Sequence, residues 1–242
     1  MLPIAGAICL AVSQPSAPDA GEPPRLRAPA AALPTSAASA AGFAPRGWSV
    51  ELARKGDLNG DGRPDLVAIL KGRDPNCIVT NAGVPNAIDT NPRQLLVAFG
   101  SKSGFILRAS SATIIPRSDD PYMDDPLEPD AFTIRRGVLS LGLNYWRSMG
   151  GWRSYSTKLS FRWDGKHMRL IGYDRDALQR NSGGTEDVSV NFVTGRASII
   201  KGSLEDDIED TRQWQRVPAQ KFETLEAIAD GLAFQPKLRT DN

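Results

Sequence analysis

Short apolar segments separated by polar, glycine-containing turns recur along the chain from Trp48 onward. In several of them apolar and polar side chains alternate, as between Val138 and Leu143, which is the period-two pattern of a half-buried β-strand. Strand-sized segments span residues 48–53, 66–70, 94–99, 104–109, 131–135, 138–143, 154–163, 168–173, 187–192 and 197–202. The pattern predicts an all-β fold.

Turn residues join these segments in pairs. The connections include Gly100-Ser101-Lys102-Ser103, Arg136-Gly137, Asp164-Gly165-Lys166 and Thr194-Gly195-Arg196, which are typical of hairpins. About five hairpins in tandem predict a β-propeller-like array, and a β-sandwich is the alternative. The stretches 74–93 and 118–130 exceed common connection lengths, so we expect functional loops or covers of sheet edges there.

One helix is predicted near the C-terminus, between Pro218 and Phe234. Apolar residues follow helical spacing there, at Phe222, Leu225, Ile228 and Leu232. We expect a short C-terminal helix that packs on the sheets through this stripe.

Composition divides the chain into three parts. Residues 1–13 are predicted to be a signal segment, which ends in the small-x-small pattern Ala11-Val12-Ser13 and is too short to span a bilayer. The segment has no Lys or Arg before its apolar core, so either the true start lies upstream or the signal is weak. Residues 14–46, rich in Ala, Pro and Ser, are predicted to be a disordered tether. Residues 47–242 are predicted to form a single all-β domain.

The signal segment predicts export to the periplasm without a transmembrane span. A lipid anchor through Cys9 is an alternative, although Ile8 stands where a lipoprotein signal has a small residue. Cys77 then lacks a disulfide partner and is expected to be a small buried residue. The formal net charge of +1 and the absence of a Lys/Arg run argue against a nucleic-acid partner.

The most specific motif is an oxygen-rich loop over residues 57–65. Side-chain oxygens recur at alternating positions and one residue adds a backbone carbonyl, which gives the candidate metal ligands Asp57, Asn59, Asp61, Arg63 and Asp65. Ala68 stands where a helical Ca²⁺ loop has its bidentate Glu, and the apolar residues around it predict that the loop joins two strands. We expect a bound Ca²⁺ here, and a solvated turn is the alternative.

A second candidate site is a loop with aromatic and arginine side chains around a double glycine. These residue types dominate the energetic centres of protein interfaces, and a double glycine is expected at a loop tip. The candidate partner-binding residues are Trp146, Arg147, Ser148, Gly150, Gly151, Trp152, Arg153, Ser154 and Tyr155.

Catalytic motifs are missing from the sequence, so we expect a protein that is not an enzyme. His167 follows Asp164-Gly165-Lys166 and is expected to be a turn histidine rather than a general base. The acidic residues of segment 119–130 could form a second cation site, a charged surface or a solvated loop: Asp119, Asp120, Asp124, Asp125, Glu128 and Asp130. The acidic run 205–210 is interpreted as a polar connection.

The stretch Lys55 to Asp65 resembles the calcium loop of FG-GAP repeats, which occur in integrin-type propellers and in many exported bacterial proteins. Residues 91–97, 155–165 and 170–174 are similar to segments of small exported bacterial proteins that carry one such loop. The resemblance covers most of residues 48–202.

Within that group the chain resembles periplasmic immunity proteins, which protect bacteria with a killing type IV secretion system from their own peptidoglycan-hydrolase effector. Those proteins are similar to periplasmic inhibitors of invertebrate-type lysozyme, which insert a Gly-rich hairpin loop with Ser and Tyr into the active-site cleft. The resemblance implies that residues 148–155 form the matching loop and that the partner is a lysozyme-like hydrolase. A calcium-stabilised adhesive or glycan-binding propeller module is the alternative.

Overall fold

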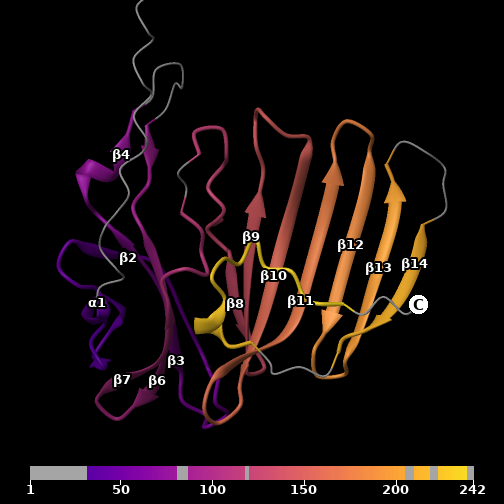
Figure 1. The fold of residues 1–242 in the computed structure, drawn as a ribbon. Coiled ribbons are helices and arrows are strands. Elements are labelled where there is room, and N and C mark those ends of the chain that lie inside the picture. Colours follow the sequence, from indigo (N-terminus) through magenta and orange to yellow (C-terminus); the bar gives the residue numbers. More distant parts are fainter. Residues whose placement is uncertain (1–31, 81–86, 118–119, 205–209, 219–222, 239–242) are drawn as a thin grey trace, which may run out of the picture.

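Two antiparallel sheets account for most of the computed structural model, which describes residues 32–80, 87–117, 120–204, 210–218 and 223–238 (Figure 1). The five-stranded sheet has the order β1-β7-β6-β3-β2 and contains β1 (Ser36–Ala37), β2 (Trp48–Gly56), β3 (Asp65–Gly72), β6 (Arg93–Ser101) and β7 (Gly104–Ser111). The seven-stranded sheet runs in sequence order from β8 to β14, as β8 (Phe132–Arg135), β9 (Val138–Tyr145), β10 (Arg153–Trp163), β11 (Met168–Gln179), β12 (Gly184–Asn191), β13 (Arg196–Ser203) and β14 (Thr211–Arg216). The prediction of an all-β fold is confirmed.

The predicted hairpins do not form separate propeller blades. Each of the ten predicted strand segments overlaps an observed strand, but β8 to β14 hydrogen-bond consecutively in one continuous sheet. A propeller needs its strands grouped into independent small sheets around a central axis. The short turns of this half of the chain instead let each hairpin pair edge to edge with the next, so the propeller prediction is wrong and the arrangement is closer to the two-sheet alternative.

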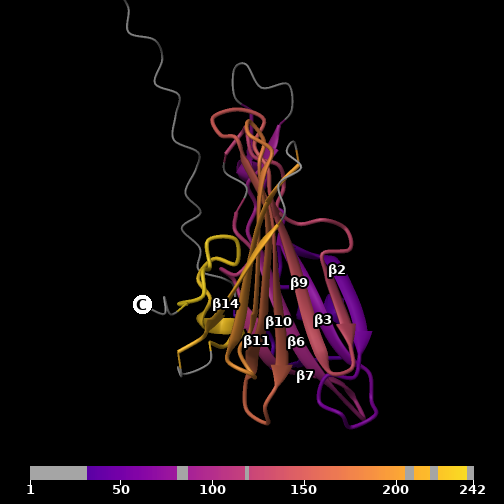
Figure 2. The same ribbon diagram turned by 90° about the vertical axis from the view of Figure 1, so that its right-hand side faces the viewer.

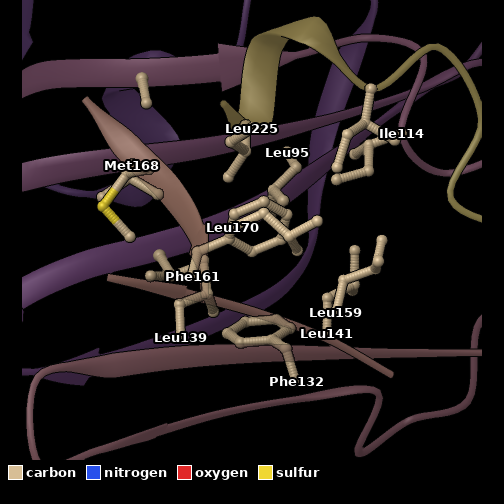
Figure 3. Packing of buried hydrophobic residues seen from close by; sticks show 14 of the residues in the cluster. Leu95, Ile114, Phe132, Leu139, Leu141, Leu159, Phe161, Met168, Leu170 and Leu225 are labelled. Atoms are coloured by element: carbon tan, nitrogen blue, oxygen red, sulfur yellow. The ribbon is translucent and has the colours of Figure 1, made fainter. Parts of the chain in front are cut away.

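The main core lies between the inner faces of the two sheets. Val67 and Ile69 of β3, from the five-stranded sheet, join the same buried cluster as Leu141 of β9 and Phe161 of β10. Figure 3 shows Leu95 of β6, from the five-stranded sheet, close to Leu170 of β11, from the seven-stranded sheet. Large apolar residues at alternating positions of β9 and β10 therefore fix which face of the seven-stranded sheet points inward.

The five-stranded sheet is buried on its second face as well. Leu66, Ala68 and Leu70 of β3 point away from the main core and pack with Phe43, which is fully buried. Phe43 ends the short helix α1 (Ala40–Phe43), which follows β1. Because both faces of the sheet are buried at β3, this strand has apolar side chains at consecutive positions.

Residues 32–46 are thus part of the domain, and this portion of the predicted tether is wrong. β1 pairs with β7 through Ser36 opposite Ile106 and Ala37 opposite Phe105. The Ala-rich composition does not indicate that Phe43 packs in a core. It also does not indicate β1, which is a strand of only two residues. The predicted signal segment, Cys9 and the first part of the tether lie outside the described residues.

The predicted C-terminal helix is wrong over the described part of the chain. Residues 223–238 contain only the 3₁₀ turn η2 (Leu225–Ala227), although Leu225, Ile228 and Leu232 are buried in the main core as the stripe predicted. The Gly231 amide donates to the Ile114 carbonyl at 2.9 Å, so at this position the backbone bonds to a distant part of the chain rather than to a helical turn. Figure 2 shows this C-terminal segment along one side of the seven-stranded sheet. Phe222 lies outside the described residues.

The long connection after β3 carries its own small elements. It contains the 3₁₀ turn η1 (Pro75–Cys77) and the strand pair β4 (Ile78–Val79) and β5 (Ile88–Asp89). Cys77 is free and buried, as predicted, and burial raises the pKa of its thiol.

Candidate functional site

The oxygen-rich loop joins β2 to β3, as predicted, and is organised by hydrogen bonds between its side chains and its own backbone. The Asp57 carboxylate accepts from the amides of Gly60 and Gly62 at 2.7 and 2.9 Å. Both glycines have positive φ, at 78° and 79°, a conformation that disfavours any residue with a Cβ. The Asp61 carboxylate accepts from the Arg63 amide at 2.8 Å, and this bond lowers the pKa of Asp61.

Asp65 is the anchor of this loop and is fully buried. Its two carboxylate oxygens accept from the amides of Leu58, inside the loop, and Gly100, in the neighbouring strand β6, at 2.8 and 2.9 Å. The residue predicted as the last ligand therefore ties the loop to the sheet. Asp57, Asn59 and Asp61 remain at the surface of the loop and supply the accessible oxygens, together with the Arg63 carbonyl.

Oxygen donors of this kind suit a hard cation, so the loop fits Ca²⁺ in the chemistry of its donor set. Within the described part of the chain, no three Asp, Glu, His or Cys side chains come together closely enough to hold a metal ion. The remaining donors of the loop are an amide side chain and a backbone carbonyl, which also suit Ca²⁺.

The aromatic loop connects β9 to β10, at the top of the sheet in the view of Figure 1. Trp152 and Met149 expose 62% and 61% of their surface, and Trp146 exposes 39%. Tyr122, 40% exposed, lies beside them because its carbonyl accepts from the Ser148 amide at 2.9 Å. Four large apolar side chains are therefore exposed on this loop and on the segment bonded to it, and we call them together the tip surface: Tyr122, Trp146, Met149 and Trp152.

Arg180, which directly follows β11, braces this loop. Its Nη2 donates to the carbonyls of Arg147 and Gly151, each at 2.7 Å, and its backbone amide donates to the Trp152 carbonyl at 2.8 Å. Its guanidinium also lies 5.0 Å from the centre of the Trp146 ring. This role could not be predicted from the sequence, because a single arginine after a strand has no distinctive pattern.

A second brace comes from segment 120–130. Arg147 Nη2 forms an ion pair with Asp120 at 2.8 Å, and the Asp124 amide donates to the Trp146 carbonyl at 3.1 Å. Gly150 has a φ of 79°, which allows the chain to turn at the tip. The loop is thus held from two sides.

Three residues predicted to contact a partner belong to strand β10 rather than to the tip. Arg153 lies near Glu186 at 3.3 Å, and Ser154 lines a groove beside the loop. Tyr155 stacks on Tyr145 with ring centres 4.7 Å apart, and the Arg175 guanidinium lies 4.3 Å from its ring centre. Burial raises the pKa of Tyr155. Tyr155 therefore supports the loop base from inside the fold.

The groove beside the loop has a volume of about 500 Å³ and carboxylates on its walls. Asp176 and Asp187 lie directly opposite each other on β11 and β12, and burial together with Asp176 and Asp210 raises the pKa of Asp187. Trp146 forms part of the rim.

Segment 120–130 holds other parts of the fold together. Asp125 pairs with Arg93 at 2.6 Å, and Arg93 also binds Glu51 at 2.7 Å. Asp124, Asp125 and Glu128 line the groove. Asp119 and most of the acidic run 205–210 lie outside the described residues.

His167 lies in the β10–β11 turn, as predicted. The Asp164 carboxylate accepts from the amides of Lys166 and His167 at 2.8 and 2.7 Å. The histidine is therefore part of a hairpin turn.

Comparisons of the chain with protein-family models, with curated proteins and with solved structures found no match. Among the described residues, no helix has both the length and the apolar character needed to cross a bilayer.

Proposed function

We propose that this protein is an exported inhibitor of a peptidoglycan hydrolase and that it binds the enzyme through the tip surface. The observation that carries the proposal is the exposure of Trp152 and Met149 on a loop braced by Arg180 and by the Arg147–Asp120 ion pair. Exposed large aromatic side chains that cluster in this way are typical of protein contact sites.

Rigidity of the loop supports an inhibitory role. A loop that is already fixed loses little conformational entropy on binding, so more of the contact free energy appears as affinity. The β9–β10 loop lies at one end of the sheet, level with the β11–β12 turn (Figure 1), where a partner can reach it.

Inhibition by this route needs no chemistry from the inhibitor. Trp152 would fill a groove shaped for sugar rings, since indole rings stack well on apolar and ring surfaces. Arg153 has half of its side chain exposed and a longer ion pair with Glu186, at 3.3 Å, so it could exchange that partner for a catalytic carboxylate of the enzyme and block its acid or base role. Arg147 is engaged by Asp120 and acts on the loop's shape instead.

Periplasmic location is part of the proposal. It rests on the apolar N-terminal segment with its small-residue cleavage pattern. The peptidoglycan substrate of the proposed partner lies in the same compartment.

Ca²⁺ binding to the oxygen-rich loop is proposed as a stabilising feature. Asp57, Asn59, Asp61 and the Arg63 carbonyl would supply the ligands, while Asp65 keeps the loop attached to β6. The ion would add stability to the folded state and would take no part in inhibition.

A glycan-binding module is the second candidate, favoured by one observation. Trp146 borders a groove of about 500 Å³ that also contains Asn144 and several carboxylates, and an aromatic rim with polar walls suits a sugar chain.

A clearing assay on purified peptidoglycan separates the two candidates. An invertebrate-type lysozyme and the hydrolase effector of a type IV secretion system are each mixed with the protein, and turbidity is followed. Slower clearing by at least one enzyme, with no sedimentation of the protein on peptidoglycan alone, supports the inhibitor. Unchanged clearing with both enzymes would contradict it, and co-sedimentation with peptidoglycan would favour the glycan-binding module.

A further inference from the structure

An exposed tryptophan at the free edge of the seven-stranded sheet is flanked by arginines. Trp214 of β14 exposes 62% of its surface. The guanidinium carbons of Arg196 and Arg212 lie 5.7 and 5.9 Å from its ring centre. Val193, in the adjacent β12–β13 turn, exposes 63%. Cationic and apolar groups therefore meet in one place.

The strand register places two of the arginines in direct opposition. Arg196 of β13 is the partner of Arg216 on β14, and Ser198 is the partner of Trp214. Side chains two apart on a strand share a face, so Arg212, Trp214 and Arg216 all project from the same side of the sheet. Like charges directly opposite each other are unfavourable.

The described part of the chain offers no compensating charge. None of the three arginines forms an ion pair with a described residue. The contrast with Arg93 and Arg147, each paired with a carboxylate at less than 3 Å, is clear. Repulsion between Arg196 and Arg216 would be relieved by an anion bound between them.

A pocket exists at this position. It has a volume of about 330 Å³, and its lining consists of Thr194, Gly195, Arg196, Trp214, Gln215 and Arg216. Arg212 does not line it, since it lies on the other side of Trp214 along the strand. The indole ring therefore separates the pocket arginines from Arg212 and contacts the Arg196 guanidinium.

We propose that Arg196 and Arg216 form a binding site for a phosphate group. A phosphate group carries nearly two negative charges and at least three accepting oxygens, so it can bond to both guanidinium forks and offset both positive charges, whereas a carboxylate offsets only one. The exposed Val193 and Trp214 beside the site fit a phosphate that is carried next to an apolar group. A soluble phosphate compound and a phospholipid headgroup share this chemistry.

The site is independent of the proposed inhibitory function. The β12–β13 turn lies at the opposite end of the sheet from the β9–β10 loop (Figure 1), so ligands at the two sites would not compete. Phosphate binding can therefore be measured on the isolated full-length protein.

Inorganic phosphate is the first probe, titrated calorimetrically at constant ionic strength against a chloride control, because surface charges are screened by salt. Arg196→Gln/Arg216→Gln should weaken binding by at least about tenfold, which corresponds to about 1.4 kcal/mol, because it removes the charged hydrogen bonds to the phosphate. Arg196→Lys/Arg216→Lys keeps both charges but lacks the guanidinium forks. Its affinity for phosphate should lie between those of the wild type and the double glutamine variant. Arg135→Gln/Arg162→Gln, at two exposed arginines of β8 and β10, is the charge-matched control and should bind like the wild type.

The second probe is sedimentation with vesicles of phosphatidylglycerol or of phosphatidylcholine. Binding of the wild type, but not of Arg196→Gln/Arg216→Gln, to the anionic vesicles identifies the lipid headgroup as the source. Binding of inorganic phosphate alone identifies a soluble phosphate compound. The proposal is overturned if phosphate and chloride give the same heat, or if the double glutamine variant binds phosphate as well as the wild type.

Discussion

Arg180 Nη2 donates a hydrogen bond of 2.7 Å to the carbonyl of Gly151, across the base of the β9–β10 loop. A glycine at a loop tip is the least restrained kind of residue, and this bond removes much of that freedom. The same guanidinium nitrogen reaches the Arg147 carbonyl on the other side of the loop. One side chain thereby closes the loop that presents Met149 and Trp152.

Arg180→Ala should loosen this loop while leaving the sheets intact. We expect the loop amides to exchange hydrogen faster by about tenfold or more and global stability to fall by only about 1 kcal/mol, since the lost bonds lie at the surface. Hydrogen exchange with mass spectrometry measures the first quantity and urea unfolding the second. Arg153→Ala, an exposed arginine close to the same loop, is the control and should leave exchange unchanged. Equal exchange in Arg180→Ala and wild type would exclude the bracing role.

Asp65→Ala should destabilise the whole domain. The change removes the acceptor for two amides, those of Leu58 and Gly100, and leaves both without a partner next to a fully buried site. Each buried unpaired donor costs about 1 to 3 kcal/mol, so for two donors we expect a loss of roughly 2 to 6 kcal/mol by denaturant unfolding. Asp61→Ala, at an exposed position of the same loop, should destabilise the domain much less than Asp65→Ala. Equal effects of the two substitutions would contradict the anchor role of Asp65.

Ca²⁺ should raise the unfolding temperature of the wild-type protein, and a chelator should reverse the rise. Ligand binding to the folded state at about 100 times Kd adds about 2.7 kcal/mol of stability. Asp57→Ala/Asp61→Ala should remove the response to Ca²⁺. A melting temperature that is the same in Ca²⁺ and in chelator would count against a cation at this loop.

Alkaline pH should destabilise the fold through two tyrosines. Burial raises the pKa of both Tyr155 and Tyr173 above the ordinary value of 10.0, so the unfolded chain loses these protons first. Their contribution is fully present below pH 10 and is lost as the pH rises through the folded-state pKa values. Absorbance at 295 nm should show part of the tyrosine signal titrating late, and Tyr155→Phe and Tyr173→Phe should each remove a portion of that late signal. A single titration of all tyrosines near pH 10 would contradict this prediction.

Most strands could be predicted from sequence because their apolar residues alternate or run continuously. β14 was missed because Thr211 to Arg216 are polar apart from Trp214, and the strand is held by pairing with β13 rather than by burial. α1 was missed because Phe43 is the one aromatic side chain of the Ala-rich residues 32–46, and its importance depends on the β-sheet face that it covers. The way in which the hairpins assemble could not be predicted either. The sequence of a hairpin is the same kind of pattern whether the hairpin belongs to a propeller blade or to a wider sheet.

The candidate sites were found in part. The oxygen-rich loop could be predicted from the spacing of Asp57, Asn59 and Asp61, because these side chains bond to backbone amides only a few residues away. Tyr155 was expected at the tip, but its position in β10 directs it onto Tyr145 and Arg175. Arg180 contacts the tip from across a hairpin, and such a contact between distant residues leaves no pattern in the sequence.

The most direct test of the inhibitory surface is to compare two equally exposed tryptophans. Trp152 and Trp214 each expose 62% of their surface, but only Trp152 lies on the tip surface. In the peptidoglycan clearing assay, Trp152→Ala should raise the inhibition constant roughly 30-fold or more, which corresponds to about 2 kcal/mol, while Trp214→Ala should inhibit like the wild type. Both variants should unfold at the temperature of the wild type. Full inhibition by Trp152→Ala, or an equal loss in both variants, would contradict the assignment of the tip surface as the site that binds the hydrolase.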